Sequence, residues 1–338
     1  MARNHNTLTT SNISKQPNAK PTGRGPDIYC ESFPDSCGFA YICVMASNKT
    51  EVQTGHLPDP LTINSRIVSL GSCFATEIGA RLKEYCPYTA VNPFGVLYNP
   101  VSVANSVKML GGLWPKAAFT TDDVILRDTN PVYQKTQGRT DVKAAAETGH
   151  RQIAPEGGGY VSFYHHGSFA RKTETEFLEN ANAALAEGKR QFTEAGTVII
   201  TFGTSWTYRH IEKDMIVSNC HKHPAWEFRR ELLDMETIYR LWSDILSWFR
   251  DKQWIFTVSP IRHKKDGMHG NQISKAILLL SVERLVSGFD NAHYFPAYEI
   301  VLDELRDYCF YKEDLVHPSD AAIEHVWNRF KKYGMISG

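Results

Sequence analysis

Apolar residues along the chain fall into two patterns, short uninterrupted runs and longer stretches in which they recur every three or four positions. The runs are typical of buried strands, and the recurring stretches are typical of helices that pack on a sheet. Strands are predicted over residues 67–71, 197–203 and 254–258, and helices over residues 74–82, 101–110, 177–188, 238–249, 273–286, 297–306 and 319–334. Strands that alternate with helices in this order predict a parallel sheet covered on both faces.

The distribution of these elements divides the chain into a tail and one large domain. Residues 1–55 are rich in Asn, Thr, Ser, Lys, Pro and Gly and have little periodic apolar content, so we expect a disordered N-terminal extension. Residues 56–335 contain all of the predicted elements and should form an α/β domain. Within it, residues from about 111 to 195 lack a clear period, which indicates an irregular and partly helical insertion that acts as a lid or substrate-binding subdomain.

The first predicted strand stops at a Gly-Ser pair and passes directly into a helical pattern. Ser72 therefore falls at a strand-to-helix turn, where the first N–H groups of the helix have no partner within it. Such a place stabilises an oxyanion and suits a serine nucleophile. Serine is also a preferred N-cap, so Ser72 could instead do no more than cap the helix. Ligands of parallel sheets bind where strands end, and the later strands end beside Gly203 and Ser259.

An Asp-x-x-His sequence precedes the last predicted helix. Residues three apart in a turn can face the same side, so Asp314 could accept a hydrogen bond from His317 and hold its ring toward a serine. With Ser72 this would form a Ser-His-Asp triad, in which His317 is the general base and Asp314 fixes its tautomer. The alternative is an ordinary surface Asp and His ahead of a helix, because so short a pattern often occurs by chance.

Charge and cysteine content argue against several classes of protein. Lys plus Arg and Asp plus Glu are equal at 37 each, so no overall field favours nucleic acid or anionic lipid. No stretch approaches the roughly 20 apolar residues of a membrane span, and no signal-peptide pattern opens the chain. Seven cysteines without a Cys-x-x-Cys pair are typical of a reduced protein. We therefore expect a cytoplasmic protein without a nucleic-acid or membrane partner, and no oligomeric state is predicted.

Histidines and a basic cluster offer two further candidate sites. His165-His166 and His221-Lys-His223 could feed a metal site, but no His-Glu-x-x-His helix or cysteine–histidine ladder accompanies them. Polar loops and no cofactor are the simpler expectation. Arg262, His263 and two lysines follow the third strand, where a solvated loop is the ordinary explanation and an anionic substrate group is the functional one.

Seven separated stretches of the chain share one resemblance. Ser69-Leu-Gly-Ser-Cys-Phe-Ala75 resembles the motif that names the GSCFA family, a branch of the SGNH/GDSL hydrolase-like superfamily. The other stretches follow in the family's order, and together they cover residues from about 60 to 335. They are Asn92-Pro-Phe-Gly95, Thr201-Phe-Gly-Thr-Ser-Trp206, Asn219-Cys-His-Lys222, Ser259-Pro-Ile-Arg-His263, Tyr294-Phe-Pro-Ala-Tyr-Glu299 and Asp314-Leu-Val-His-Pro-Ser319.

This resemblance implies a three-layer flavodoxin-like α/β/α fold with Ser72 as nucleophile, His317 as base and Asp314 as orienting acid. SGNH enzymes stabilise the oxyanion with the N–H of the serine, a glycine N–H and an asparagine from a Gly-x-Asn-Asp segment. Here that segment is Gly203-Thr-Ser205, so the asparagine is absent from its place. The candidate oxyanion-hole groups are Ser72, Gly95, Asn219 and Ser205, and the candidate substrate contacts are Gly203, Thr204, Trp206, Arg262 and His263.

The function expected from these residues is that of a serine-dependent acyl-ester hydrolase or acyltransferase. Its substrate would be an acylated small molecule or carbohydrate, and the reaction would pass through an acyl-Ser72 intermediate. Two alternatives remain. One is a noncatalytic ligand-binding module that keeps the fold without a working oxyanion hole, and the other is a metal-dependent hydrolase built on the histidines.

Overall fold

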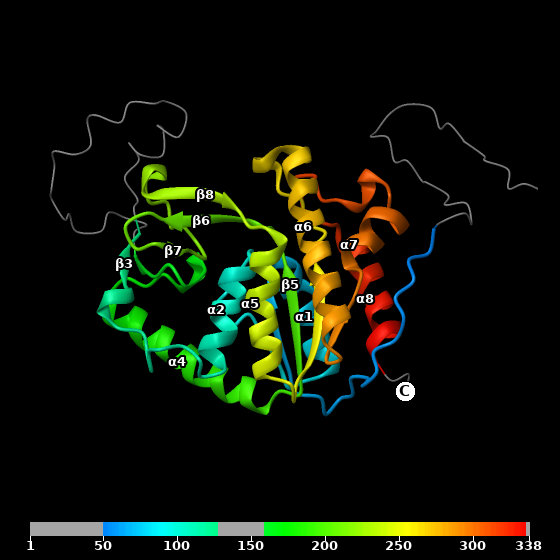
Figure 1. Ribbon diagram of the computed structural model, residues 1–338, viewed down its shortest axis with the longest axis horizontal. Coiled ribbons are helices and arrows are strands. Elements are labelled where there is room, and N and C mark those ends of the chain that lie inside the picture. The colour runs from blue at the N-terminus through cyan, green and yellow to red at the C-terminus, as the bar shows by residue number, and fades with distance from the viewer. Residues whose placement is uncertain (1–49, 128–158, 336–338) are drawn as a thin grey trace, which may run out of the picture. The chain divides into compact units, whose positions relative to one another are not determined.

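A five-stranded parallel sheet forms the centre of the protein, as the computed structural model shows for a chain described over residues 50–127 and 159–335 (Figure 1). The strand order across the sheet is β10-β9-β5-β1-β2. Counted along the chain this order is 2-1-3-4-5, the doubly wound order of flavodoxin-like folds. The strands are β1 (Ile67–Gly71), β2 (Thr89–Val91), β5 (Thr197–Phe202), β9 (Gln253–Val258) and β10 (Ala292–Tyr294).

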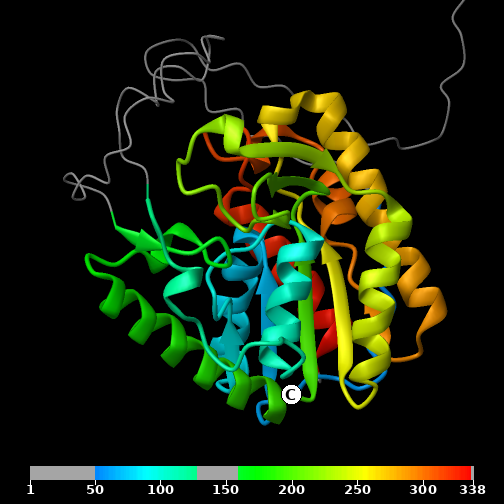
Figure 2. The ribbon, with the colours of Figure 1, turned by 60° about the vertical axis from the view of Figure 1, so that its left-hand side comes forward.

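Helices cover both faces of this sheet and complete three α/β/α layers, which confirms the predicted fold class (Figures 1 and 2). One face is covered by α2 (Pro100–Leu110), α4 (Glu174–Glu194), α5 (Met235–Trp248) and α6 (Gly267–Gly288). The other face is covered by α1 (Cys73–Tyr85), by α7 (Ala297–Glu299) with the π-helical turn η5 (Ile300–Glu304), and by α8 (Asp320–Gly334).

The alternation of side chains along β5 explains why both faces are apolar. Successive residues of a strand point to opposite faces of the sheet. Val198 and Ile200 therefore pack with α2, α4 and α5, whereas Ile199 packs with α1 and α8. A central strand that is buried on both sides needs an unbroken apolar run, and this is the pattern that the sequence shows.

A second, antiparallel sheet lies between β5 and α5 in the sequence. It has the order β7-β6-β8 and consists of β6 (Trp206–His210), β7 (Met215–Ile216) and β8 (Phe228–Leu232). A short antiparallel pair joins β3 (Ile125–Leu126) to β4 (Tyr160–Val161). The remaining elements are single 3₁₀ turns: η1 (Thr121–Asp123), η2 (Gly167–Phe169), η3 (Ala225–Glu227), η4 (Lys264–Asp266) and η6 (Tyr308–Phe310).

The structure corrects two details of the sequence prediction. The helix expected to end at Gly188 continues to Glu194, because Gly188 has an ordinary helical conformation and serves as a contact point instead. A Cβ atom on Gly188 would lie 2.6 Å from Leu110 Cδ2, so its absence lets α4 approach α2. The helix expected over residues 297–306 is instead the three-residue α7 followed by the π-helical turn η5, which ends at Glu304.

The predicted tail and insertion lie partly outside the described residues, which leave out 1–49, 128–158 and 336–338. At the end of the predicted tail, the Val52 N–H donates to Glu304 Oε1 at 2.8 Å, so this point of the chain is bonded to the domain. In the predicted insertion, α4 belongs to the helical layer over the sheet. The boundaries of the extension and the role of the insertion stay predictions.

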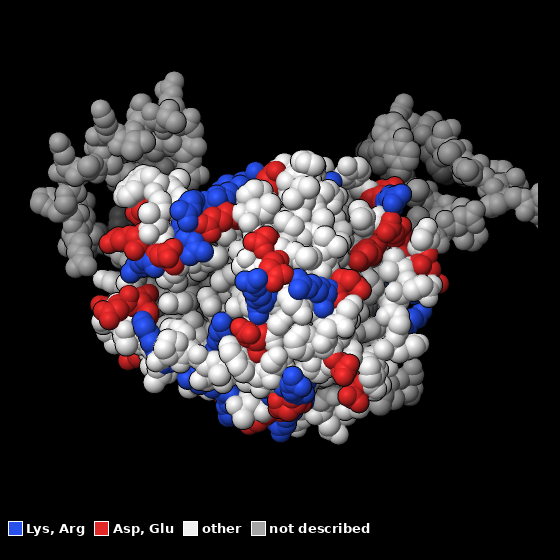
Figure 3. Space-filling view, viewed as in Figure 1, with Lys and Arg blue, Asp and Glu red and all other residues white. Residues whose placement is uncertain are grey.

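The surface and composition of the described residues add three observations. Basic and acidic side chains are mixed over the face in Figure 3. None of the helices in the described ranges combines the length and hydropathy that a membrane crossing requires. Among the described cysteines, Cys73, Cys86 and Cys220 are free thiols.

Candidate active site

The turn between β1 and α1 depends on a glycine. Gly71 has φ +142°, a conformation that side-chain-bearing residues rarely adopt, and a Cβ atom there would lie 2.1 Å from Thr201 O on the neighbouring strand. The chain can therefore pass tightly over β5 and deliver Ser72 to the start of α1. This is the point between the first and third strands of the 2-1-3-4-5 order at which the chain connections change direction, and ligands of such sheets bind there.

Ser72 occupies the N-cap position of α1 but does not cap it with its side chain. Its Oγ makes no hydrogen bond with any described residue, and the residue is only 1% exposed. The reading of Ser72 as a simple side-chain cap is therefore wrong. Buried hydroxyls are nearly always bonded, so this unbonded one keeps Ser72 a candidate nucleophile.

The ends of the neighbouring strand and loop surround Ser72. A Cβ atom on Gly203 would lie 3.4 Å from Ser72 Cβ, so the absence of a side chain at Gly203 keeps this place open. The N–H groups of Gly203 and Thr204 both donate to Tyr98 O, at 2.8 and 3.0 Å. Tyr98 also contacts Cys73, with its hydroxyl 3.5 Å from the sulfur, and burial raises the pKa of this phenol.

Asp314 and His317 form the pair that their spacing predicts. His317 Nδ1 lies 2.6 Å from Asp314 Oδ2, and because a carboxylate only accepts, Nδ1 is the protonated nitrogen and Nε2 is left to act as a base. Asp314 Oδ1 accepts the N–H groups of Val316 and His317 at 2.8 and 3.0 Å. The hydrogen bond from the His317 side chain, with those two backbone bonds, holds the pKa of Asp314 well below its usual range.

His263 connects the surroundings of Ser72 with His317. Burial is the main cause that lowers the pKa of His263 to about 4, and the charges of Lys275 and His317 act in the same direction. A hydrogen bond to the Gly203 carbonyl acts against them. His263 is thus neutral near pH 7, in contact with the strand end beside Ser72 and within electrostatic range of His317.

A buried lysine that the sequence analysis did not identify lies at the same strand ends. Lys275 of α6 is 1% exposed, and its Nζ donates to Gly203 O and Ser259 O at 2.6 Å each. Burial lowers the pKa of Lys275 to about 7. The lysine joins the carboxyl ends of β5 and β9. Its position three residues before buried Leu278, on the apolar stripe of α6, was the signal available in the sequence.

Two of the predicted oxyanion donors already have partners. The Ser72 N–H donates to Thr201 O at 3.2 Å, which extends the ladder between β1 and β5. The Gly95 N–H donates to Asn92 O at 2.8 Å within its own turn. Their role as oxyanion donors stays a prediction, and it requires these internal bonds to be exchanged.

Ser205 is also held within the fold. Its N–H donates to Ser274 Oγ at 2.8 Å and its hydroxyl to Ser274 O at 3.3 Å, while Thr204 Oγ1 lies 3.0 Å from the same Ser274 Oγ. These bonds fasten the end of β5 to α6. Both residues therefore support the strand end that carries Gly203.

Asn219 is the predicted oxyanion donor with a free amide. Its Oδ1 accepts the His221 N–H at 2.8 Å, whereas its Nδ2 has no hydrogen bond to a described residue. The neighbouring turn links it to Gly95: Nδ2 lies 3.9 Å from where a Cβ on Gly167 would be, and a Cβ on Gly95 would lie 2.4 Å from His166 Cβ. The structure thus brings Asn219 and Gly95 to one group of loops.

Two backbone donors that follow Ser72 directly in the sequence have no partner among the described residues. The N–H groups of Cys73 and Phe74 open α1 and have no acceptor among the described residues, while the Ala75 N–H returns to Ser72 O at 2.8 Å. The first turn of a helix presents such donors together with the positive end of its dipole. These two N–H groups are further candidates for stabilising an oxyanion.

Trp206 and Arg262, two of the predicted substrate contacts, each bond to a neighbouring segment of the fold. Trp206 begins β6, bonds through Nε1 to Gly270 O at 3.4 Å, and carries the Arg230 guanidinium 4.6 Å from its ring. Arg262 contacts the Asp314–His317 turn, where its Nη1 donates to Leu315 O at 3.3 Å.

One histidine of each predicted pair is buried, His165 after β4 and His221 between β7 and β8. His165 Nδ1 lies 3.1 Å from Ser162 Oγ, and His221 Nε2 lies 2.8 Å from Ser162 O. Burial lowers the pKa of His165 to about 3 and that of His221 to about 4. Across the described part of the chain, no three His, Cys, Asp or Glu side chains gather as a metal site would require.

Comparison with known proteins assigns this arrangement to a family. No curated protein and no solved structure gives a match to the chain. The model of the GSCFA family, however, matches residues 66–330, a range that includes Ser72, Gly203, His263 and the Asp314–His317 pair. Because this match covers most of the sequence, the chain belongs to the GSCFA family.

Proposed function

We propose that this protein is a serine-dependent acyl-ester hydrolase or acyltransferase of the SGNH type, acting on an acylated small molecule or carbohydrate. The observation that carries the proposal is the 2.6 Å contact between His317 Nδ1 and Asp314 Oδ2, together with the buried and unbonded Oγ of Ser72. An imidazole oriented by a carboxylate can act as a general base, and a hydroxyl without a partner among the described residues is available to one.

The reaction would proceed through an acyl-enzyme. Ser72 Oγ attacks the ester carbonyl while His317 Nε2 takes its proton, and Asp314 stabilises the imidazolium that forms. The oxyanion is stabilised by the unpaired N–H groups of Cys73 and Phe74, aided by the amide of Asn219. Collapse expels the alcohol, which takes its proton from His317, and leaves an acyl-Ser72 ester. Water or a second alcohol, deprotonated by His317, then takes the acyl group.

The decisive experiment compares ester turnover and active-site labelling in four proteins: wild type, Ser72→Ala, His317→Ala and the double variant. With 4-nitrophenyl acetate as substrate, each single change should reduce kcat by more than about 10³-fold, and the double variant should lose little more, because members of a triad act as a unit. A fluorophosphonate probe should label wild type at Ser72. Ser287→Ala, at an exposed serine of α6, should match wild type in both assays.

The main rival is a noncatalytic binding module, favoured by the internal bonds of the Ser72 and Gly95 N–H groups. A folded wild type with neither turnover nor labelling would decide for the rival, whereas wild-type turnover in Ser72→Ala would show that Ser72 is not the nucleophile. Activity lost on chelation and restored by a divalent metal would instead favour a metal-dependent hydrolase.

A further inference from the structure

A cavity of about 210 Å³ lies beside the Asp314–His317 turn, which Arg262 of the cavity wall contacts through Leu315 O. Its walls come from the segment after β9, the start of α6, and the stretch from α7 to η6. Figure 1 shows α6 and α7 next to each other, and the Tyr298 hydroxyl donates to Gln272 Oε1 at 2.6 Å between them. The side chains that decide its chemistry are Arg262, Tyr298, Leu302, Leu305, Tyr308 and Tyr311.

Arg262 is the distinctive charge of this cavity. Its guanidinium carbon lies 5.5 Å from the ring centroid of Tyr308 and 5.1 Å from that of Tyr311, and Nη1 donates to Leu315 O. No carboxylate of the described residues pairs with it. A guanidinium offers five donors in a planar fork, so most of its capacity is left for a ligand.

The two other charged side chains of the cavity wall have bonding partners of their own. Arg306 pairs with Asp303 at 2.8 Å, and Asp307 Oδ1 accepts the Cys309 N–H at 2.8 Å. The rest of the wall is mainly leucine, valine and tyrosine. The cavity therefore combines one unpaired guanidinium with an apolar body.

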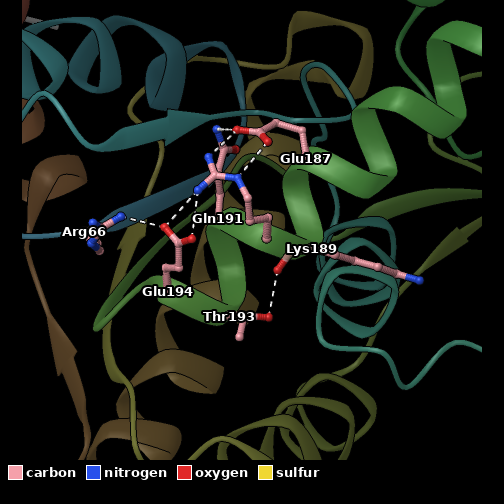
Figure 4. Close-up of polar contacts among 7 residues, drawn as sticks. Arg66, Glu187, Lys189, Gln191, Thr193 and Glu194 are labelled. Carbon is pink, nitrogen blue, oxygen red and sulfur yellow. Dashed lines mark hydrogen bonds and ion pairs between the residues drawn. The ribbon is translucent and has the colours of Figure 1, made fainter.

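A second hollow in the protein contains an arginine, Arg66, that is paired with a carboxylate and so can be compared with Arg262. At the other end of β1, Arg66 Nη1 lies 2.5 Å from Glu194 Oε2, and the same carboxylate takes the guanidinium of Arg190 at 2.8 Å (Figure 4). Arg66 also lies over a tyrosine, at 5.0 Å from the Tyr88 ring. Arg262 differs from Arg66 in having no carboxylate partner among the described residues. A ligand anion would occupy the position that Glu194 has at Arg66.

Arg262 also connects the cavity with the candidate catalytic residues. The backbone N–H of Arg262 donates to the carbonyl oxygen of Val316 at 3.1 Å, and Val316 directly precedes His317. Asn271, on the cavity wall, accepts the His263 N–H with its Oδ1 at 2.9 Å. A group bound in the cavity would thus lie next to the backbone segments that hold His263 and His317.

We propose that this cavity binds the anionic end of the substrate, a carboxylate or phosphate joined to an apolar or aromatic body. This inference rests on the proposed function only in assigning the anion to the substrate. The guanidinium of Arg262 takes two anion oxygens through parallel hydrogen bonds, and the tyrosine and leucine walls take the body.

Binding is tested by calorimetry on the full-length protein with three probes of similar size: benzoate, phenyl phosphate and benzyl alcohol. At least one anion should bind at least about tenfold more tightly than the alcohol, and the tighter anion identifies the preferred group. Arg262→Gln should remove this preference, and Arg262→Lys should keep part of it. Arg66→Gln, the matched control at the paired arginine, should bind like wild type. Equal binding of all three probes, or an unchanged preference in folded Arg262→Gln, overturns the proposal.

A turnover assay separates this proposal from the proposed function. The ratio of kcat/KM for the anionic mono(4-nitrophenyl) glutarate to that for neutral 4-nitrophenyl acetate should fall at least about tenfold in Arg262→Gln. Turnover that depends on Ser72 with a ratio unchanged by Arg262→Gln refutes the substrate assignment and leaves the hydrolase intact. Anion binding that depends on Arg262 without any turnover refutes the hydrolase and retains the cavity as an anion site.

Discussion

At the scale of single residues, sequence predicts best what depends on near neighbours. The Asp314–His317 contact follows from a three-residue spacing in a turn, and the place of Ser72 follows from a glycine at a strand end. The contact of Lys275 and His263 with one another's surroundings could not be predicted in this way. Both side chains bond to the carbonyl of Gly203, which is far from them in the sequence. Convergence on a backbone carbonyl leaves no side-chain pattern that could predict it.

The orienting role of Asp314 can be tested separately from its charge on the surface. Asp314→Asn keeps an oxygen for the N–H groups of Val316 and His317 but places an NH₂ donor toward Nδ1, which favours the wrong imidazole tautomer. We expect kcat for 4-nitrophenyl acetate to fall by up to about 10⁴-fold with little change in KM. Asp320→Asn, which changes an exposed carboxylate at the start of α8, should keep wild-type kinetics. Wild-type kcat in Asp314→Asn would show that this carboxylate does not orient the base.

At the scale of elements, the long and strongly periodic segments were predictable and the short ones were not. The strands β1, β5 and β9 and the helices α2 and α8 lie where the apolar pattern puts them. The edge strands β2 and β10 have three residues each, and the β7-β6-β8 sheet mixes polar with apolar side chains, so neither gives a distinct period. The pairing of such strands is decided by tertiary contacts.

Two helix starts provide a test of what the Ser72 hydroxyl does. Asn99 caps α2, with its Oδ1 accepting the Ser102 N–H at 2.9 Å, whereas Ser72 makes no such bond at α1. Asn99→Ala should lower the free energy of unfolding by about 1–2 kcal/mol. Ser72→Ala removes a buried, unbonded hydroxyl and should leave this free energy unchanged or raise it. Urea unfolding of both variants measures the difference, and a loss in Ser72→Ala as large as in Asn99→Ala would restore the capping role.

At the scale of the whole molecule, the parallel sheet was predictable, but the way the flanking loops are buried was not. The 2-1-3-4-5 strand order brings the ends of β1, β5 and β9 together, which places Ser72 beside Gly203. His165 and His221 are buried and lie against aromatic side chains rather than in a polar loop. A pair of adjacent histidines in the sequence does not reveal that one of them is enclosed.

These enclosed histidines make the stability of the whole fold depend on pH. Their pKa values of about 3 for His165 and about 4 for His221 lie below the ordinary value of 6.5, so between pH 6.5 and 4 the unfolded chain binds more protons than the folded one. Stability present at pH 7 is therefore lost as the pH falls. Between pH 7 and 5, each histidine should reduce the free energy of unfolding by about 2 kcal/mol.

Urea unfolding at these two pH values checks this dependence with a pair of variants. His165→Gln lowers the stability at pH 7, since Ser162 Oγ then loses its ring partner, but it also removes one titrating group. The loss between pH 7 and 5 should accordingly be about 2 kcal/mol smaller than in wild type. His56→Gln, at an exposed histidine, should leave the wild-type pH dependence in place. If His165→Gln and wild type lose the same free energy over this interval, the pKa of His165 does not differ between the folded and the unfolded protein. The acid sensitivity must then come from other groups.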